Sequence, residues 1–150
     1  MFVYRLCRAA FASLDGEGAR LYRGRWNSPG QRVVYTSGSL ALASLEYMVH
    51  VPAELVPVDL VALTIQIPDD ISPAPLDVDA LPSDWRELVD HAACRDAGDA
   101  WLRRGEMLLR VPAAPIPTEL NVLINADHSE AHRVTVVARR PFRFDPRFIR

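Results

Sequence analysis

The stretch Ser39–Val49 reads S-L-A-L-A-S-L-E-Y-M-V, and Glu46 is its only formally charged residue. Apolar residues lie one helical turn before this glutamate (Leu42, Ala43) and about one turn after it (Val49). A helix that is apolar on most faces is expected to be largely buried. Because burying a lone carboxylate is costly unless it is paired, hydrogen-bonded or protonated, Glu46 either has a partner elsewhere in the chain or is retained for chemistry.

The sequence around this helix predicts a single α+β domain, residues 1–150. Ser37 or Ser39 is placed to cap the helix, and Pro52 ends it. Residues 15–30 are rich in Gly, Arg and polar side chains and are expected to form a long surface loop, and residues 68–82 to be irregular. Strands are predicted at 3–7, 32–36, 60–67, 106–111 and 133–138, while 120–124 is compatible with a strand or a helix. A further helix is predicted from Ser83, with Trp85, Leu88, Val89 and Ala92 on one face. A short helix is also predicted at 99–103. Since strands and helices do not alternate as βαβ units, α+β is favoured over a doubly wound sheet.

Composition restricts the class of protein. The chain has 150 residues with 49% hydrophobic content, and no apolar run approaches the roughly 20 residues that a membrane span needs. Arg5 and Arg8 interrupt any signal-peptide core. Cys7 and Cys94 are isolated, which fits a reducing compartment. We therefore expect a cytoplasmic protein without a membrane partner.

The charge pattern argues against a general affinity for nucleic acid. The net charge is −2, and all 17 basic residues are arginine. The lack of lysine excludes mechanisms that need a Schiff-base or P-loop lysine. His128 and His132 are four residues apart but lack a clear third ligand, so no metal site is predicted.

One segment concentrates side chains that could carry chemistry. It holds G-R-W-N-S-P-G (24–30), V-V-Y-T-S (33–37) and the helix with Glu46. The planar guanidinium of Arg25 suits a phosphate or pyrophosphate, and the ring of Tyr35 can stack on a heterocycle. A partly desolvated carboxylate can stabilise positive charge at a sugar C1′. Together these groups suit a nucleotide whose N-glycosidic bond is broken.

Each of these residues also has a structural interpretation. Arg25 and Glu46 could form an ion pair that only stabilises the fold. Tyr35 could be a core aromatic residue, and Trp26 a packing anchor. Spacing alone does not decide between the two interpretations.

These segments resemble the RES domain, a family named for an arginine, a glutamate and a serine. The resemblance rests on G-R-W-N-S-P-G, V-V-Y-T-S and A-L-A-S-L-E-Y-M-V-H, and continues through G-D-A-W-L-R-R-G (98–105) and V-P-A-A-P-I-P-T-E-L-N-V-L-I-N-A-D-H (111–128). It implies a fold similar to ADP-ribosyltransferases, with a mixed or antiparallel sheet and flanking helices. It also implies a bacterial toxin that consumes NAD as its substrate by phosphorolysis, hydrolysis or ADP-ribosyl transfer to a protein target. An Xre-type helix-turn-helix antitoxin would be the partner, in an oligomeric complex.

The resemblance assigns site residues by position. It implies Arg25, Tyr35 and Glu46 as catalytic residues, with Arg25 and Tyr35 also holding NAD. It adds four positions to the NAD-binding set: Arg5, Ala113, Asn121 and Asn125. We expect Glu46 to face a cleft near Arg25 and Tyr35.

One family position is not retained. The family serine falls on Ala113, which has no hydroxyl group. The alternative to an active enzyme is therefore a catalytically attenuated module that binds NAD and antitoxin. A ribonuclease toxin fits less well, because the chain is acidic and shows no histidine acid–base pair.

Overall fold

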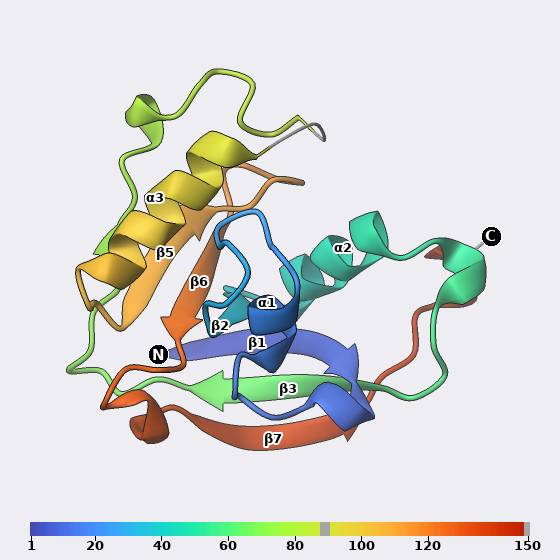
Figure 1. The fold of residues 1–150 in the computed structure, drawn as a ribbon. Coiled ribbons are helices and arrows are strands. Elements are labelled where there is room, and N and C mark those ends of the chain that lie inside the picture. The colour runs from blue at the N-terminus through green and yellow to red at the C-terminus, as the bar shows by residue number, and fades with distance from the viewer. Residues whose placement is uncertain (88–90, 149–150) are drawn as a thin grey trace.

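The computed structural model, which describes residues 1–87 and 91–148, confirms the α+β class. Its sheet has seven strands in the order β4-β5-β6-β2-β1-β3-β7 (Figure 1). The strands are β1 (Phe2–Arg8), β2 (Val33–Ser37), β3 (Leu60–Gln66), β4 (Ala74–Pro75), β5 (Leu108–Pro112), β6 (Leu120–Asn125) and β7 (Thr135–Pro141). All neighbouring strands pair antiparallel except β4 and β5, so the sheet is mixed.

Three α-helices accompany the described strands: α1 (Glu17–Leu21), α2 (Leu40–His50) and α3 (Ala92–Arg103). Short 3-10 turns lie at Ala9–Phe11, Ala53–Leu55, Val78–Ala80, Ala131–Arg133 and Pro146–Phe148. Two serines are proposed as caps for α2, and Ser39 is the one that caps it. Its side chain accepts a hydrogen bond from the backbone N–H of Leu42 at 3.1 Å. Figure 1 shows α2 and α3 well apart from one another, with α3 alongside β5.

The core consists of three apolar clusters. One lies beneath α2 (Leu6, Ala43, Leu60, Phe144), and a second lies beneath α3 (Trp26, Val33, Cys94, Trp101, Leu109, Val111, Leu123). Because side chains alternate along a strand, the intervening strand residues point to the other face of the sheet. There they form the third cluster, which includes Val3, Val34, Leu63, Ile65, Val122 and Ile124.

The sheet opens between β1 and β2. Among the described residues, only Tyr4 and Ser37 pair between these strands, whereas β1 and β3 share seven pairs. Because a single residue pair joins β1 and β2 at the centre of the sheet, there is room between these two strands, in the region flanked by α2 and α3.

The segment 15–30 is more ordered than its composition indicates. It contains the helix α1, and Trp26 and Asn27 within it are 3% and 0% exposed. The side chain of Asn27 donates to the carbonyls of Ala19 and Ser28 at 2.9 and 3.0 Å. A polar residue therefore lies inside this segment because its amide satisfies backbone groups.

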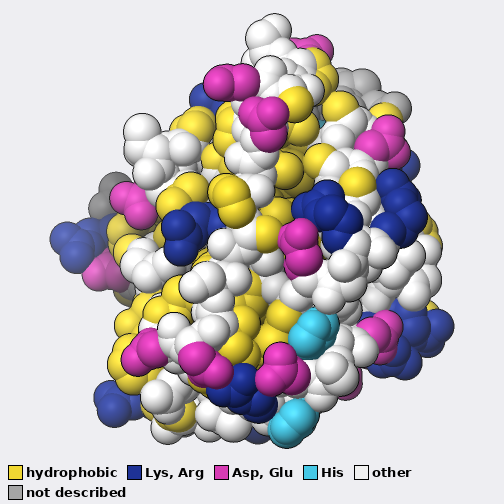
Figure 2. All heavy atoms as spheres, turned by 90° about the vertical axis from the view of Figure 1, so that its left-hand side faces the viewer, with side chains coloured by type: hydrophobic (Ala, Val, Ile, Leu, Met, Phe, Trp, Pro, Cys, Tyr) yellow, Lys and Arg dark blue, Asp and Glu magenta, His cyan; other side chains and the backbone are white. Residues whose placement is uncertain are grey.

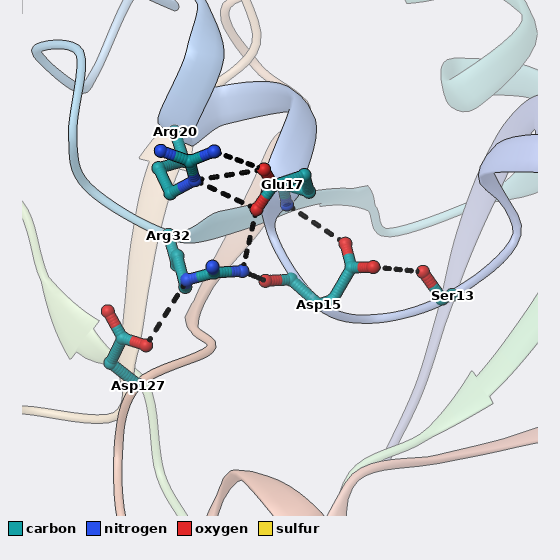
Figure 3. Close-up of polar contacts among 6 residues, drawn as sticks. All are labelled: Ser13, Asp15, Glu17, Arg20, Arg32 and Asp127. Carbon is teal, nitrogen blue, oxygen red and sulfur yellow. Dashed lines mark hydrogen bonds and ion pairs between the residues drawn. The ribbon is translucent and has the colours of Figure 1, made fainter.

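Surface ion pairs attach α1 to the start of β2. Asp15 accepts from the backbone N–H of Glu17 at 2.9 Å, and Glu17 pairs with Arg20 and, at 2.8 Å, with Arg32 (Figure 3). The network continues to Ser13 on one side and Asp127 on the other. Exposed ion pairs contribute little individually, so this network fixes the position of α1 more than it stabilises the fold.

The prediction of a helix that starts at Ser83 is wrong for the described residues. Residues 83–86 form a turn, 88–90 lie outside the described residues, and the helix starts at Ala92. The predicted 99–103 helix is thus the end of the longer α3, whose buried face is formed by Cys94, Gly98 and Trp101.

The expectation that α2 is largely buried is also wrong. Only Leu42 and Ala43 are buried in it, and Val49 is 61% exposed. Glu46 is half-buried, so its carboxylate is not sealed in a core.

Acidic and basic side chains are interspersed on the face of the molecule that Figure 2 shows. No helix in the described part of the chain is long and apolar enough to cross a membrane.

Candidate active site

A cavity of about 560 Å³ lies where the sheet opens. Both diverging strands contribute to it, β1 with residues 4–6 and β2 with residues 35–37. Other parts of the wall come from the loop with Arg25, from α2 with Glu46, from α3 with Arg95, and from the β5–β6 end with Pro112, Ala114 and Asn121. The cavity therefore brings together segments that are far apart in the sequence.

Glu46 is held by an amide. The Nδ2 atom of Asn121, on β6, donates to Oε1 of Glu46 at 2.6 Å. Among the described residues, the Oδ1 atom of Asn121 is buried and has no hydrogen-bond partner. The carboxylate thus has a neutral hydrogen-bond donor as its neighbour.

Arg25 is anchored away from Glu46. Its Nη1 donates to the backbone carbonyl of Trp85 at 2.6 Å and lies 3.0 Å from Nδ1 of His91. Its guanidinium carbon lies 6.0 Å from the centre of the Trp85 ring, within reach of a cation–π contact. No ion pair joins it to Glu46 among the described residues, so the structural ion pair considered as an alternative does not form.

Tyr35 lines the cavity with its ring, while its hydroxyl is used within the protein. The hydroxyl accepts from the N–H of Trp26 at 3.1 Å and donates to Oδ1 of Asn27 at 2.7 Å. Burial raises the pKa of Tyr35, so the hydroxyl keeps its proton. Gly24 makes this contact possible, since a Cβ there would lie 2.4 Å from the tyrosine oxygen. Tyr35 thereby fixes the loop on which Arg25 lies.

Asp99 fixes the same loop from α3. Its carboxylate accepts from the backbone N–H of Ser28 at 3.0 Å and from the hydroxyl of Ser28 at 2.5 Å. The sequence motifs do not single out Asp99, although it lies within the G-D-A-W-L-R-R-G segment.

Arg5 borders the cavity but is not directed to Arg25. Alternation along β1 puts it on the sheet face opposite Tyr4 and Leu6. Its Nη1 donates to the carbonyl of Ser13 at 2.9 Å.

Asn125 and Ala113 do not border the cavity. Asn125 is 8% exposed and bonds to backbone at the other end of β6, with Nδ2 donating to the carbonyl of Glu106 at 3.4 Å and Oδ1 accepting from the N–H of Asp127 at 3.1 Å. Ala113 is 0% exposed, although both of its neighbours line the cavity. The geometry favours a structural role for both residues.

The cavity wall carries a surplus of basic groups. Its described lining includes one carboxylate, Glu46, and four arginines and two histidines: Arg5, Arg23, Arg25, Arg95, His50 and His91. The sequence does not single out several of these, because only the tertiary fold brings them to this place. Guanidinium groups are suited to phosphate oxygens, so the wall favours a ligand with more than one negative charge.

No cluster of three or more His, Cys, Asp or Glu residues suitable for a metal occurs among the described residues. Nδ1 of His128 accepts from the N–H of Glu130 at 3.1 Å, and Nδ1 of His132 lies 2.9 Å from the carbonyl of Ser129.

Comparison with known proteins identifies the family. The model of the RES domain matches residues 2–145. The chain belongs to the RES domain family. This confirms the resemblance drawn from the G-R-W-N-S-P-G and later segments.

Two curated RES-like relatives match nearly the whole chain. The protein named Toxin Res from Photorhabdus laumondii subsp. laumondii is 36% identical over 154 residues, covering 100% of this chain and 98% of that protein. The Prs ADP-ribosylating toxin of Sphingobium sp. is 34% identical over 140 residues, covering 91% of this chain and 87% of that protein.

The RES fold seen here also matches a solved structure. A chain in the crystal structure of the M. tuberculosis MbcT–MbcA toxin–antitoxin complex superposes with a TM-score of 0.79 at 21% identity. The match covers 94% of this chain and 83% of that one, and it supports the same fold.

Proposed function

We propose that this RES domain is a toxin that consumes NAD by cleaving the bond between nicotinamide and ribose. The observation that carries the proposal is the environment of the Glu46 carboxylate. Glu46 is a half-buried carboxylate in a cavity whose described lining otherwise takes its formal charges from arginines, and a neutral amide holds it at 2.6 Å. One curated relative is named Toxin Res, and the name of another, an ADP-ribosylating toxin, points to the same chemistry.

The basic wall would hold the diphosphate of NAD. Arg25 is the strongest candidate, because it borders the cavity and its guanidinium is held by a neutral carbonyl and a histidine. Hydrogen bonds between charged partners are stronger than those to a neutral carbonyl, so a phosphate oxygen can compete for this arginine. Arg23 also lines the cavity and adds to the positive potential.

Glu46 would act on the ribose. In NAD the nicotinamide nitrogen carries a positive charge, and the electron pair of the C1′–N bond leaves with it as neutral nicotinamide. Positive charge then develops at C1′, where a nearby carboxylate stabilises it. Water, inorganic phosphate or a protein side chain bonds to C1′, and a nucleophile that carries a proton releases it.

The site predicts which assigned residues touch NAD. Glu46 and Arg25 would contact it directly, and the ring of Tyr35 forms part of the wall. The hydroxyl of Tyr35 would instead hold the Arg25 loop, since both of its hydrogen bonds are internal.

We further propose a cytoplasmic toxin neutralised by an Xre-type antitoxin in an oligomeric complex. The match to a chain of a toxin–antitoxin complex supports an antitoxin partner. Co-expression with a neighbouring helix-turn-helix gene product, followed by co-purification, would test this pairing.

The alanine at position 113, where the family has a serine, favours a second candidate function. In this function the chain is an attenuated module that binds NAD without turnover. The methyl group of Ala113 is 0% exposed and cannot donate a hydrogen bond. Calorimetry showing NAD affinity without nicotinamide release would support this second candidate over the first.

Product analysis tests the proposal. Purified protein is incubated with NAD, with and without phosphate. Free ADP-ribose, its 1-phosphate and a modified protein distinguish the three acceptors, and loss of NAD no faster than with Glu46→Ala protein would exclude the proposed activity.

A further inference from the structure

We propose that Asn121 is a positioning residue, which orients the carboxylate of Glu46 and does not itself contact the nucleotide. This inference rests on the proposed function, because it assigns Asn121 a role in NAD cleavage.

The first argument is the availability of its polar atoms. Asn121 borders the cavity, but its Nδ2 is already bonded to Oε1 of Glu46 at 2.6 Å. Its Oδ1 is buried and has no partner among the described residues. An amide nitrogen carries two N–H donors, so a ligand in the cavity would meet no exposed acceptor at this residue and only the one donor that does not face Glu46.

The second argument is the orientation of the amide. Turning it over would place Oδ1 against a carboxylate oxygen, so that two acceptors would face each other. The observed orientation leaves Oδ1 buried and unpaired, which is unfavourable. The bond to Glu46 thus decides how this side chain is placed.

The third argument is charge. An arginine at this place would neutralise the carboxylate, and Arg25 is instead held by Trp85 and His91. The amide of Asn121 donates a hydrogen bond to Glu46 and brings no charge. Glu46 is therefore oriented while its negative charge remains available for positive charge that develops at the ribose.

The rigid location of Asn121 supports this role. It lies on β6 opposite Val111 on one side and Ser37 on the other, in a strand paired on both edges. Glu46 lies on α2, whose last residues are exposed. The hydrogen bond therefore connects a helix residue to the centre of the sheet.

The test distinguishes a residue that orients Glu46 from one that contacts NAD directly. Nicotinamide release is measured for wild-type protein, Asn121→Ala and Asn121→Asp. We expect kcat to fall by about tenfold or more in Asn121→Ala with KM little changed, since small misplacement of a catalytic group has effects of this size. Asn121→Asp should be slower still, because it replaces the donor with a like charge. Gln66→Ala, at an exposed position on β3 away from the cavity, is the control and should keep its kcat.

Binding gives the second readout. Calorimetry is done in a Glu46→Gln background, where turnover is minimal, and the Kd for NAD should be the same with or without the additional Asn121→Ala change. A Kd about tenfold weaker in Glu46→Gln/Asn121→Ala than in Glu46→Gln would show direct contact and overturn the inference, as would an unchanged kcat in Asn121→Ala. If Asn121→Ala does not fold, the isosteric Asn121→Asp decides by the same two readouts. Wild-type protein that releases no nicotinamide would instead overturn the proposed function, and the inference with it.

Discussion

Gly98 of α3 lies directly against the backbone of Trp26, so closely that a Cβ at position 98 would be 1.7 Å from the carbonyl oxygen of Trp26. The next residue, Asp99, binds the backbone and side chain of Ser28. Helix α3 and the loop with Arg25 therefore pack as one unit, and the position of Arg25 depends on a helix about 70 residues later in the chain.

Gly98→Ala should destabilise the fold. The added methyl group would meet backbone atoms that cannot move aside, and overpacking of this kind costs about 1–3 kcal/mol. Urea denaturation measures the free energy of unfolding. Gly18→Ala in α1 is the matched control, because a Cβ there meets nothing within 4 Å, and it should leave stability unchanged or slightly increased. Equal effects of the two substitutions would contradict the close packing described here.

Tyr35→Phe should also lower the free energy of unfolding, by about 1–3 kcal/mol, because it leaves the N–H of Trp26 without its partner. It also removes the shorter of the two hydrogen bonds to Oδ1 of Asn27, which keeps only the one from the N–H of Gly24 at 3.2 Å. Tyr22→Phe serves as the comparison, since Tyr22 is 73% exposed. A Tyr35→Phe protein as stable as wild type would show that the hydroxyl does not hold the loop.

Alkaline pH should destabilise the protein through its buried acids. Burial raises the pKa of Tyr35 and also the pKa of the Cys7 and Cys94 thiols. A group that holds its proton more tightly when folded makes unfolding easier once the pH exceeds its unfolded pKa, about 10 for tyrosine. Stability measured against pH should therefore fall above about pH 9, and the fall beyond about pH 10 should be shallower in Tyr35→Phe. Identical slopes for both proteins would argue against a buried, protonated Tyr35.

The sequence predicts α2 and most strands well, because their signals are local. Ser39 and Pro52 delimit α2, and the apolar run at 60–67 is a strand by composition alone. The start of α3 is not predicted, since Gly98 is unfavourable in a helix and only its contact with Trp26 explains it. Ser83 has the chemistry of a cap, but the segment after it forms a turn whose carbonyl at Trp85 binds Arg25.

The sequence predicts which residue types form the candidate site, but it does not predict which residues form hydrogen bonds with one another there. Local motifs single out Arg25 and Glu46, yet their separate anchors, Trp85 and Asn121, depend on the tertiary fold. Asn125 carries the same side chain as Asn121, four residues further along β6, but it bonds to backbone away from the cavity. Periodicity and composition do not distinguish these two asparagines.

Ala113→Ser should increase nicotinamide release about severalfold at little cost in stability. Val111 lies opposite Asn121, and the N–H of Ala113 bonds to the carbonyl of Glu119 at 2.9 Å. Positions 113 and 121 are therefore diagonal neighbours on one face, where a serine hydroxyl can donate to the unpaired Oδ1 of Asn121. The same assay on Ala114→Ser, an identical change at the half-buried next residue, should show no gain. A stability loss in Ala113→Ser of more than about 1 kcal/mol without faster release would mean that the buried hydroxyl finds no acceptor.

The most direct measurement is the time course of nicotinamide release from NAD by wild-type protein and by Glu46→Gln protein of equal melting temperature. Glutamine keeps the shape of the side chain and can still accept from Asn121, but it lacks the charge. We predict release by the wild type and a rate about 10²-fold lower in the variant, the size of effect expected for loss of one transition-state stabiliser. Equal rates, or no release by folded wild-type protein, would contradict the account.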